Sequence, residues 1–165
     1  MVLTKEELIA TLQNEVRILL HLAGKIDRTQ LGYKPTEKQR TTLELLQYLN
    51  VMGPQLVRAI KAGTFDGAAW GAALGASQAL DFDGLLASIG KQSDDYAQQL
   101  GAWSDADFRG EIEMFGRKSS RGSLLISLVT SGHAAYRTQL FCYLKACGQD
   151  GLNTMNLWGG MDGSM

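Results

Sequence analysis

Apolar residues recur every three or four positions in four separate stretches of the chain, a spacing typical of amphipathic α-helices. The first stretch covers residues 4–26 and opens with Thr-Lys-Glu-Glu at 4–7, which has the form of a capping box. The second covers 41–62 and opens with another capping box at 41–44. Pro54 lies inside it, and because proline lacks an amide hydrogen we expect a kink there.

The third stretch begins at Asp81 or Asp83 and keeps helical spacing to Trp103. The fourth runs from about Gly122 to Cys147 and is apolar around most of its circumference in its first half, which predicts the most buried helix.

Three connections separate these stretches, and the first, residues 27–38, carries Gly32 and Pro35. Residues 63–79 are rich in glycine and alanine and predict a long crossover with one short helix around Trp70. Residues 104–122 include an alternating segment at 111–115, which favours a short extended piece. The pattern therefore predicts an all-α four-helix bundle over residues 1–150, followed by a tail at 151–165 that packs on the bundle or extends from it.

Composition and charge argue against some classes of partner and location. The chain has 165 residues, the size of one domain, with 16 Lys and Arg against 17 Asp and Glu, so no strong positive field exists to attract nucleic acid. No run approaches the roughly 20 apolar residues of a membrane span, and residues 1–7 lack a signal-peptide core, so we expect a cytoplasmic protein with no membrane partner. Cys142 and Cys147 are expected to be packing residues on different helix faces.

Residues 43–49 (Leu-Glu-Leu-Leu-Gln-Tyr-Leu), 136–140 (Tyr-Arg-Thr-Gln-Leu) and 143–148 (Tyr-Leu-Lys-Ala-Cys-Gly) resemble the second and fourth helices of DinB-like proteins. In that family the second helix reads Glu-Leu-Leu-x-His-Leu, and the fourth reads His-x-x-x-His-Arg-Gly-Gln-Leu before Tyr-Leu-Arg-x-x-Gly. The resemblance implies an up-down-down-up bundle, commonly dimeric, with a divalent metal held by three histidines. Members of that family with an assigned activity are thiol-dependent transferases and isomerases, or proposed metal-dependent hydrolases, so the resemblance implies activities of these kinds.

The three histidine positions of the family fall on Tyr48, Gly132 and Tyr136 in this sequence. A phenol must lose a proton with a pKa near 10 to bind zinc or nickel well, and glycine has no side chain. We therefore expect no metal and no other cofactor. The candidate pocket consists of these three positions with His133 and Gln139.

Each candidate also has an ordinary structural explanation. Tyr48 is either a core tyrosine whose hydroxyl has one partner or a residue that faces Tyr136. His133 lies beside an apolar helix face and is more often a histidine with one hydrogen bond than a ligand, although a mixed metal site with Glu44, Glu111 or Glu113 remains open.

The remaining polar residues singled out here, and Gln139 of the pocket, also have expected structural roles. His21 is expected on the surface, whereas Arg137 and Gln139 match the family's Arg-x-Gln and are expected to support helix packing or a dimer contact.

The resulting expectation is a metal-free DinB-like protein of unknown biochemical function that binds a small molecule or has a structural or interaction role, as a homodimer. The alternative is a thiol-dependent transferase or metal-dependent hydrolase of the DinB type. The sequence names no substrate.

Overall fold

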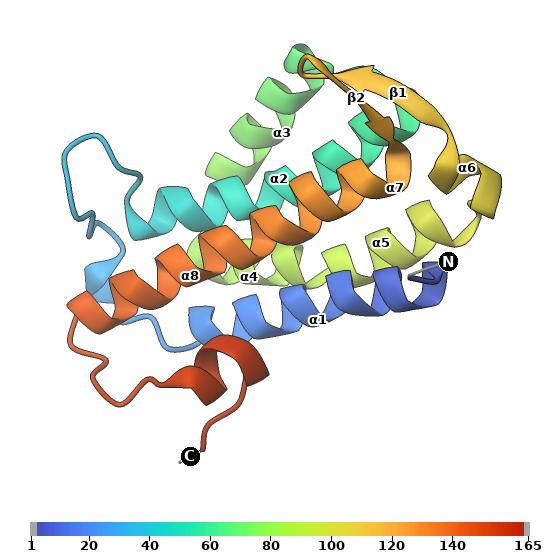
Figure 1. The fold of residues 1–165 in the computed structure, drawn as a ribbon. Coiled ribbons are helices and arrows are strands. Elements are labelled where there is room, and N and C mark those ends of the chain that lie inside the picture. The colour runs from blue at the N-terminus through green and yellow to red at the C-terminus, as the bar shows by residue number, and fades with distance from the viewer. Residues whose placement is uncertain (1–2, 164–165) are drawn as a thin grey trace.

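The computed structural model describes residues 3–163. Residues 1–2 of the expected bundle (1–150) and residues 164–165 of the expected tail (151–165) lie outside the described residues. The structure is an all-α bundle of the predicted up-down-down-up topology: the first and last helices run in one direction and the two middle ones in the other (Figure 1). The bundle elements are α1 (Lys5–Ala23), α2 (Thr42–Ala62), α4 (Phe82–Gly90) with α5 (Gln92–Gly101), and α7 (Arg121–Leu124) continued by η2 (Leu125–Thr130) and α8 (Ser131–Ala146).

Both predicted capping boxes are confirmed. The Thr4 hydroxyl accepts from the Glu7 amide at 3.2 Å while the Glu7 carboxylate accepts from the Thr4 amide at 2.7 Å. Thr41 and Glu44 make the same reciprocal pair, which satisfies backbone donors that lack helical partners.

Pro54 leaves the carbonyl of Asn50 without its helical donor, yet α2 continues to Ala62. The side-chain amide of Gln92 supplies the missing bond from α5, because its Nε2 donates to the Asn50 oxygen at 3.1 Å and to the Leu49 oxygen at 3.0 Å. This bond explains why a glutamine, 2% exposed, lies in the core.

The third helix departs from its expected form, because α4 ends at Gly90 and α5 begins at Gln92. Ile89, Tyr96 and Leu100 are buried at the expected helical spacing, and Leu85 and the polar Gln92 are buried with them. The apolar spacing could not reveal that a polar side chain is held inward by the carbonyls near Pro54.

The fourth helix is also interrupted, by the π-helical segment η2. A π turn holds more residues than an α turn and so changes the direction in which later side chains point. Ile126 is 39% exposed, whereas Leu124, Leu125 and Val129 are buried. The expectation that this helix is the most buried one was therefore wrong, because α2 buries more of its residues.

The crossover forms α3 (Gly67–Gln78), which confirms the short helix expected around Trp70. Ser77 fixes α3 to α2: its hydroxyl accepts from the Asn50 side chain at 3.0 Å and donates to the Gln47 carbonyl at 3.2 Å. These bonds place Trp70 beside the first half of α2.

The last connection contains α6 (Asp105–Arg109) and a hairpin, β1 (Glu111–Met114) antiparallel to β2 (Arg117–Ser120). The extended segment expected at 111–115 is confirmed, but its partner strand was missed. Phe115 and Gly116 make the turn with positive φ values of 52° and 71°. Phe115 is 56% exposed and its ring contacts Phe65 at a centroid distance of 5.4 Å.

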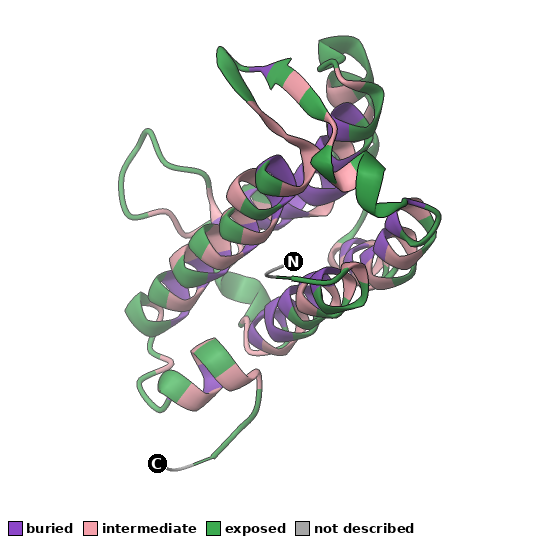
Figure 2. Cartoon of the chain, turned by 45° about the vertical axis from the view of Figure 1, so that its right-hand side comes forward, coloured by how far each residue is buried: buried purple, intermediate pink, exposed green. Residues whose placement is uncertain are grey.

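The core is lined by the inward faces of the bundle helices, while their outward faces are exposed (Figure 2). Its largest fully buried side chain is Tyr96 of α5. Within residues 3–163, no helix has the length and apolar character needed to cross a membrane.

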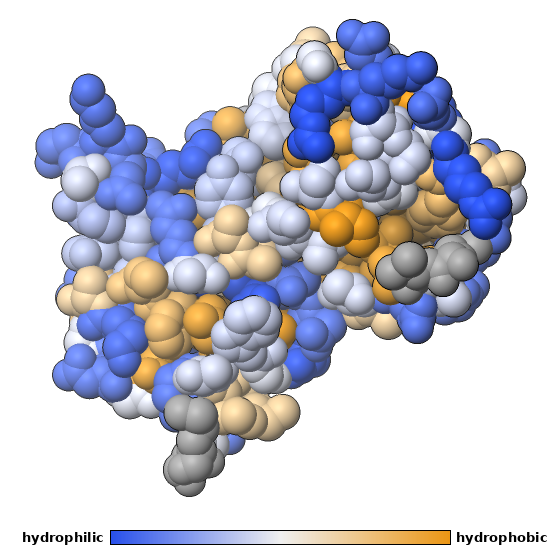
Figure 3. Space-filling view, viewed as in Figure 1, coloured by the Kyte–Doolittle hydropathy of each residue, from blue (hydrophilic) through white to orange (hydrophobic). Residues whose placement is uncertain are grey.

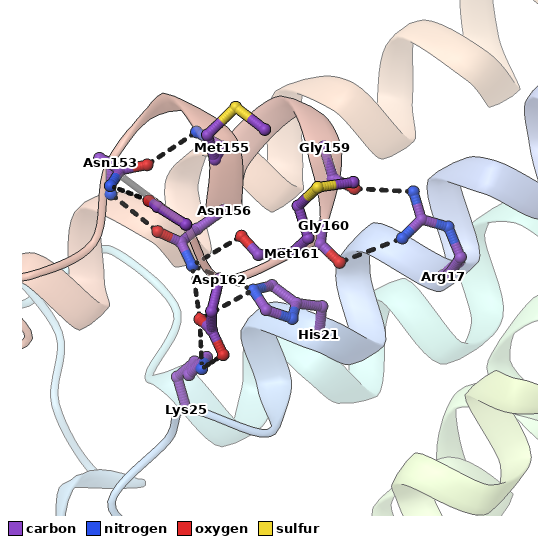
Figure 4. Close-up of polar contacts among 11 residues, drawn as sticks. Arg17, His21, Lys25, Asn153, Met155, Asn156, Gly159, Gly160, Met161 and Asp162 are labelled. Atoms are coloured by element: carbon purple, nitrogen blue, oxygen red, sulfur yellow. Dashed lines mark hydrogen bonds and ion pairs between the residues drawn. The ribbon is translucent and has the colours of Figure 1, made fainter. Parts of the chain in front are cut away.

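After α8 the chain turns back onto α1, where η3 (Met155–Gly159) forms (Figures 1 and 4). Arg17 donates to the carbonyls of Gly159 and Gly160 at 2.8 and 3.0 Å, and Lys25 pairs with Asp162 at 2.6 Å. His21 lies under this segment, 3.1 Å from the Asn156 amide nitrogen, so the expectation that it is a surface residue was wrong.

Candidate functional site

Tyr48 of α2 and Tyr136 of α8 lie against each other, with ring centroids 4.8 Å apart and an interplanar angle of 65°. Both side chains are half-buried. Burial, followed by the neighbouring Tyr136, raises the pKa of Tyr48 to about 12, and the nearby Arg40 cation only partly opposes this rise. The Tyr48 hydroxyl is therefore protonated near neutral pH and can donate a hydrogen bond.

Gly132 lies on the same helix one turn before Tyr136, but the space beside it is filled. A Cβ atom placed on Gly132 would lie 3.0 Å from the Met52 sulfur and 3.1 Å from its methyl carbon. Met52 of α2 is buried, at 1% exposure. A flexible thioether thus occupies the space that a larger side chain at position 132 would need.

This donor set does not fit a zinc or nickel ion. Tyr48 and Tyr136 offer phenols, Gly132 offers nothing, and the side chain beside Gly132 is the weakly binding thioether of Met52. In the part of the chain that the structure describes, no three His, Cys, Asp or Glu side chains are grouped as metal ligands would be.

His133 points away from the tyrosine pair and into the core. Its Nε2 lies 2.7 Å from the hydroxyl oxygen of Tyr96, and Gly53 leaves room for this bond, since a Cβ there would lie only 1.8 Å from the Tyr96 oxygen. Burial, with a smaller contribution from Arg137, lowers the pKa of His133 to about 4. His133 is thus a neutral core histidine held by Tyr96, and the structure does not bring it together with Tyr48.

Gln139 does not contact the tyrosine pair directly but is linked to it through Tyr143 and the backbone of Arg40. Its amide donates to the Tyr143 hydroxyl at 2.6 Å, and that hydroxyl donates to the Arg40 carbonyl at 3.0 Å. The backbone of Arg40 is thereby fixed to α8. The guanidinium carbon of Arg40 lies 4.1 Å from the ring centroid of Tyr48 and 6.0 Å from that of Tyr136, both within cation–π range.

A groove of 410 Å³ opens beside Tyr48 between the start of α2, the preceding loop and α3. Arg40, Gln47, Trp70 and Leu74 line it together with Tyr48. Arg40 and Gln47 were not among the site residues predicted from the sequence, and Trp70 was predicted only to lie on a short helix. The single feature of the sequence that could have drawn attention to Arg40 was its position directly before a capping box.

A second hollow, of 470 Å³, lies at the other end of the bundle between the start of α1 and α6. Leu8, Phe108 and Ile126 give it an apolar lining. It contains none of the predicted site residues, so the groove beside Tyr48 is the hollow that adjoins the candidate site.

Comparison with known proteins identifies the fold. No family model matches the chain, and no curated protein matches it. The crystal structure of a DinB-like protein, YjoA from Bacillus subtilis, superimposes with a TM-score of 0.67 over 86% of this chain and 91% of that one, at 21% sequence identity. This chain therefore has the fold of DinB-like proteins.

Proposed function

We propose that this DinB-like chain is a cytoplasmic protein that binds a small organic ligand beside the Tyr48–Tyr136 pair without a metal ion. The proposal is supported by the side chains that the resemblance places at the family's three histidine positions. Two are phenols in contact, and the third is a glycine whose space Met52 fills. A protonated phenol and a cation above it can hold a polar ligand by hydrogen bonding and charge.

The geometry favours binding over the alternative of a transferase or hydrolase. A nucleophile needs a lowered pKa or an adjacent base, whereas the pKa of Tyr48 is raised and burial raises the pKa of the Cys147 thiol. His133, the one histidine on α8, has its Nε2 engaged with Tyr96 in the core. The residues of the tyrosine pair are therefore arranged to bind and orient, with no group poised to attack.

The metal content of the purified, untagged protein tests this proposal, after expression with zinc and nickel supplied. Elemental mass spectrometry is expected to find no stoichiometric metal in the natural sequence. The variant Tyr48→His/Gly132→His/Tyr136→His, with Met52→Ala to provide space, is expected to bind one zinc per chain. Met52→Ala alone is the matched control and is expected to bind none.

Either of two results would overturn the proposal. A stoichiometric metal in the natural protein would show that other residues form a metal centre. A folded variant with three histidines that binds no zinc would show that these positions do not correspond to the family's ligands. Separately, a screen of soluble fragments in which none shifts any amide resonance would count against ligand binding itself.

We also propose a homodimer, supported by apolar side chains exposed on the segment after α8. Trp158 is 69% exposed and Met161 is 48% exposed. Light scattering is expected to give twice the chain mass of 18.0 kDa. A mass near that of one chain over a wide concentration range would disprove the dimer.

A further inference from the structure

Asn156 of η3 is a buried asparagine whose side-chain amide has a fixed orientation. The residue is 2% exposed, and its side-chain oxygen accepts from the Asn153 backbone amide at 2.9 Å. Its side-chain nitrogen, Nδ2, donates to the Asp162 carboxylate at 2.9 Å and to the Met161 carbonyl at 3.2 Å. Exchanging the two atoms would set oxygen against these acceptors and nitrogen against a donor. The atom that Asn156 turns toward α1 is therefore a donor.

The partner of this nitrogen on α1 is His21, and the contact sets the protonation state of the ring. The Nε2 atom of His21 lies 3.1 Å from Nδ2 of Asn156 (Figure 4). Because Nδ2 can only donate, Nε2 must accept, so His21 is neutral with its proton on Nδ1. A proton on Nε2 would bring two donors face to face. The hydrogen bond therefore forms only with neutral His21.

The groups around His21 oppose its protonation on balance. Lys25 and Arg17, on the same helix, repel a positive charge on the ring, whereas Asp162 of the segment after α8 attracts one from 3.7 Å. The Asp162 side chain is 70% exposed and already binds Lys25 at 2.6 Å, which weakens its attraction for the ring. Burial, followed by repulsion from Lys25, therefore lowers the pKa of His21 below its ordinary 6.5.

The segment after α8 depends on a small number of polar contacts. Among the described residues from 151 onward, Leu152 is the only buried apolar side chain, while Trp158 and Met161 are exposed. Apolar and hydrophilic residues lie side by side on this part of the surface, at the lower end of Figure 3. A helix as short as η3 does not persist without tertiary support. Loss of one anchoring hydrogen bond therefore changes the balance between the bound and the detached segment.

We propose that His21 and Asn156 form a pH-sensitive latch that holds residues 152–162 against α1. Neutral His21 accepts from Asn156 and keeps the latch closed, whereas protonated His21 opens it. Opening withdraws the Leu157 carbonyl from Arg137 and lets water reach the buried pair of Arg137 and Glu15. The latch is independent of ligand binding at the tyrosine pair.

Hydrogen–deuterium exchange of the full chain at pH 8 and pH 5 tests the latch. The lowered pKa of His21 in the closed state means that closure is complete above pH 6.5 and weakens as the pH falls. The amides of η3 are compared as protection factors, relative to an unstructured peptide of the same sequence. Their protection is expected to fall roughly three- to tenfold at pH 5, the factor that corresponds to one hydrogen bond.

The two histidines of the chain provide matched variants with opposite expectations. His21→Gln keeps an acceptor for Asn156 but cannot gain a proton, so the η3 amides should keep their protection at pH 5. His133→Gln removes the other histidine and should leave the loss at η3 unchanged. In both variants, protection of the buried amides of α2 shows that the bundle remains folded.

Three results would overturn the latch. Protection of η3 that stays constant between pH 8 and pH 5 in the natural chain would show that the segment does not respond to protonation. Higher protection at pH 5 would show that attraction by Asp162 outweighs the lost hydrogen bond. An equal loss of protection in His21→Gln and in the natural chain would assign the response to a group other than His21.

Discussion

The guanidinium of Arg137 binds both carboxylate oxygens of Glu15, at 2.6 and 3.1 Å, and thereby joins α8 to α1 inside the protein. Arg137 is 4% exposed and Glu15 is 7% exposed. Arg137 also donates to the carbonyl of Leu157, which brings the segment after α8 over the pair. The expectation that Arg137 supports helix packing is therefore confirmed.

Removing one partner of this buried pair leaves the other charge without compensation. Glu15→Ala is expected to lower the free energy of unfolding by about 3–5 kcal/mol, as measured by urea denaturation. Glu6→Ala removes an exposed carboxylate from the same helix and is expected to change it by no more than about 0.5 kcal/mol. Similar values for the two variants would contradict the role assigned to Glu15.

The bond from Gln92 to the carbonyl freed by Pro54 leads to a second prediction. Gln92→Met is expected to cost about 1–3 kcal/mol of unfolding free energy, because it leaves a buried carbonyl unpaired. Pro54→Ala restores an amide hydrogen that the Asn50 carbonyl can accept, so the same glutamine change should cost less in that background. A double-mutant cycle measured by thermal and urea unfolding checks this, and strictly additive effects would refute it.

His133 gives the protein a pH-dependent stability. Its pKa in the folded chain is about 4 against an ordinary value of 6.5, so the unfolded chain binds more protons between these values. The stability contributed by neutral His133 is complete above pH 6.5 and is lost as the pH falls toward 4. Between pH 8 and pH 5 we expect a loss of about 2 kcal/mol.

The variant His133→Gln keeps a hydrogen-bonding partner for Tyr96 but cannot titrate in this range. Its unfolding free energy should therefore change less between pH 8 and pH 5 than that of the natural chain, when both are followed by urea denaturation in matched buffers. His21 titrates in both proteins and cancels in the comparison. Identical pH profiles would show that His133 is not a buried neutral histidine.

His21 reports on the segment that covers it. Burial lowers its pKa, with repulsion from Lys25 and Arg17, while Asp162 acts in the opposite direction. In a chain truncated after Gly151, NMR titration should find a pKa closer to the ordinary 6.5. Asp162→Asn should instead lower the pKa further. A pKa that neither change moves would contradict the packing drawn in Figure 4.

Features determined by neighbouring residues could be predicted from the sequence. The two capping boxes need only a hydroxyl and a carboxylate three positions apart, and both helices begin where they predict. The glycine-rich crossover and the extended segment at 111–115 depend on similarly local preferences. The positions of Tyr48 and Tyr136 on facing helices came from the resemblance, and the contact between their rings agrees with one of the two explanations considered.

Features that depend on distant partners could not be predicted. The burial of Gln92 requires knowledge that Pro54 frees a carbonyl opposite it. The space beside Gly132 is filled by a methionine from another helix, 80 residues earlier in the chain. Gln139 was placed in the pocket, whereas its effect passes through Tyr143 to the Arg40 backbone. These are long-range relationships that helical spacing does not encode.

The polar residues of the interior have a consequence for how the helices are aligned. Leucine side chains are interchangeable in shape, so a bundle held by leucines alone allows neighbouring helices to rotate or slip by a turn at small cost. Gln92, Tyr96 and His133 engage partners at fixed directions and distances across three helices, and only one alignment satisfies them together. An apolar replacement of all three would therefore retain a compact bundle while losing its single arrangement, and with it the fixed spacing between Tyr48 and Tyr136.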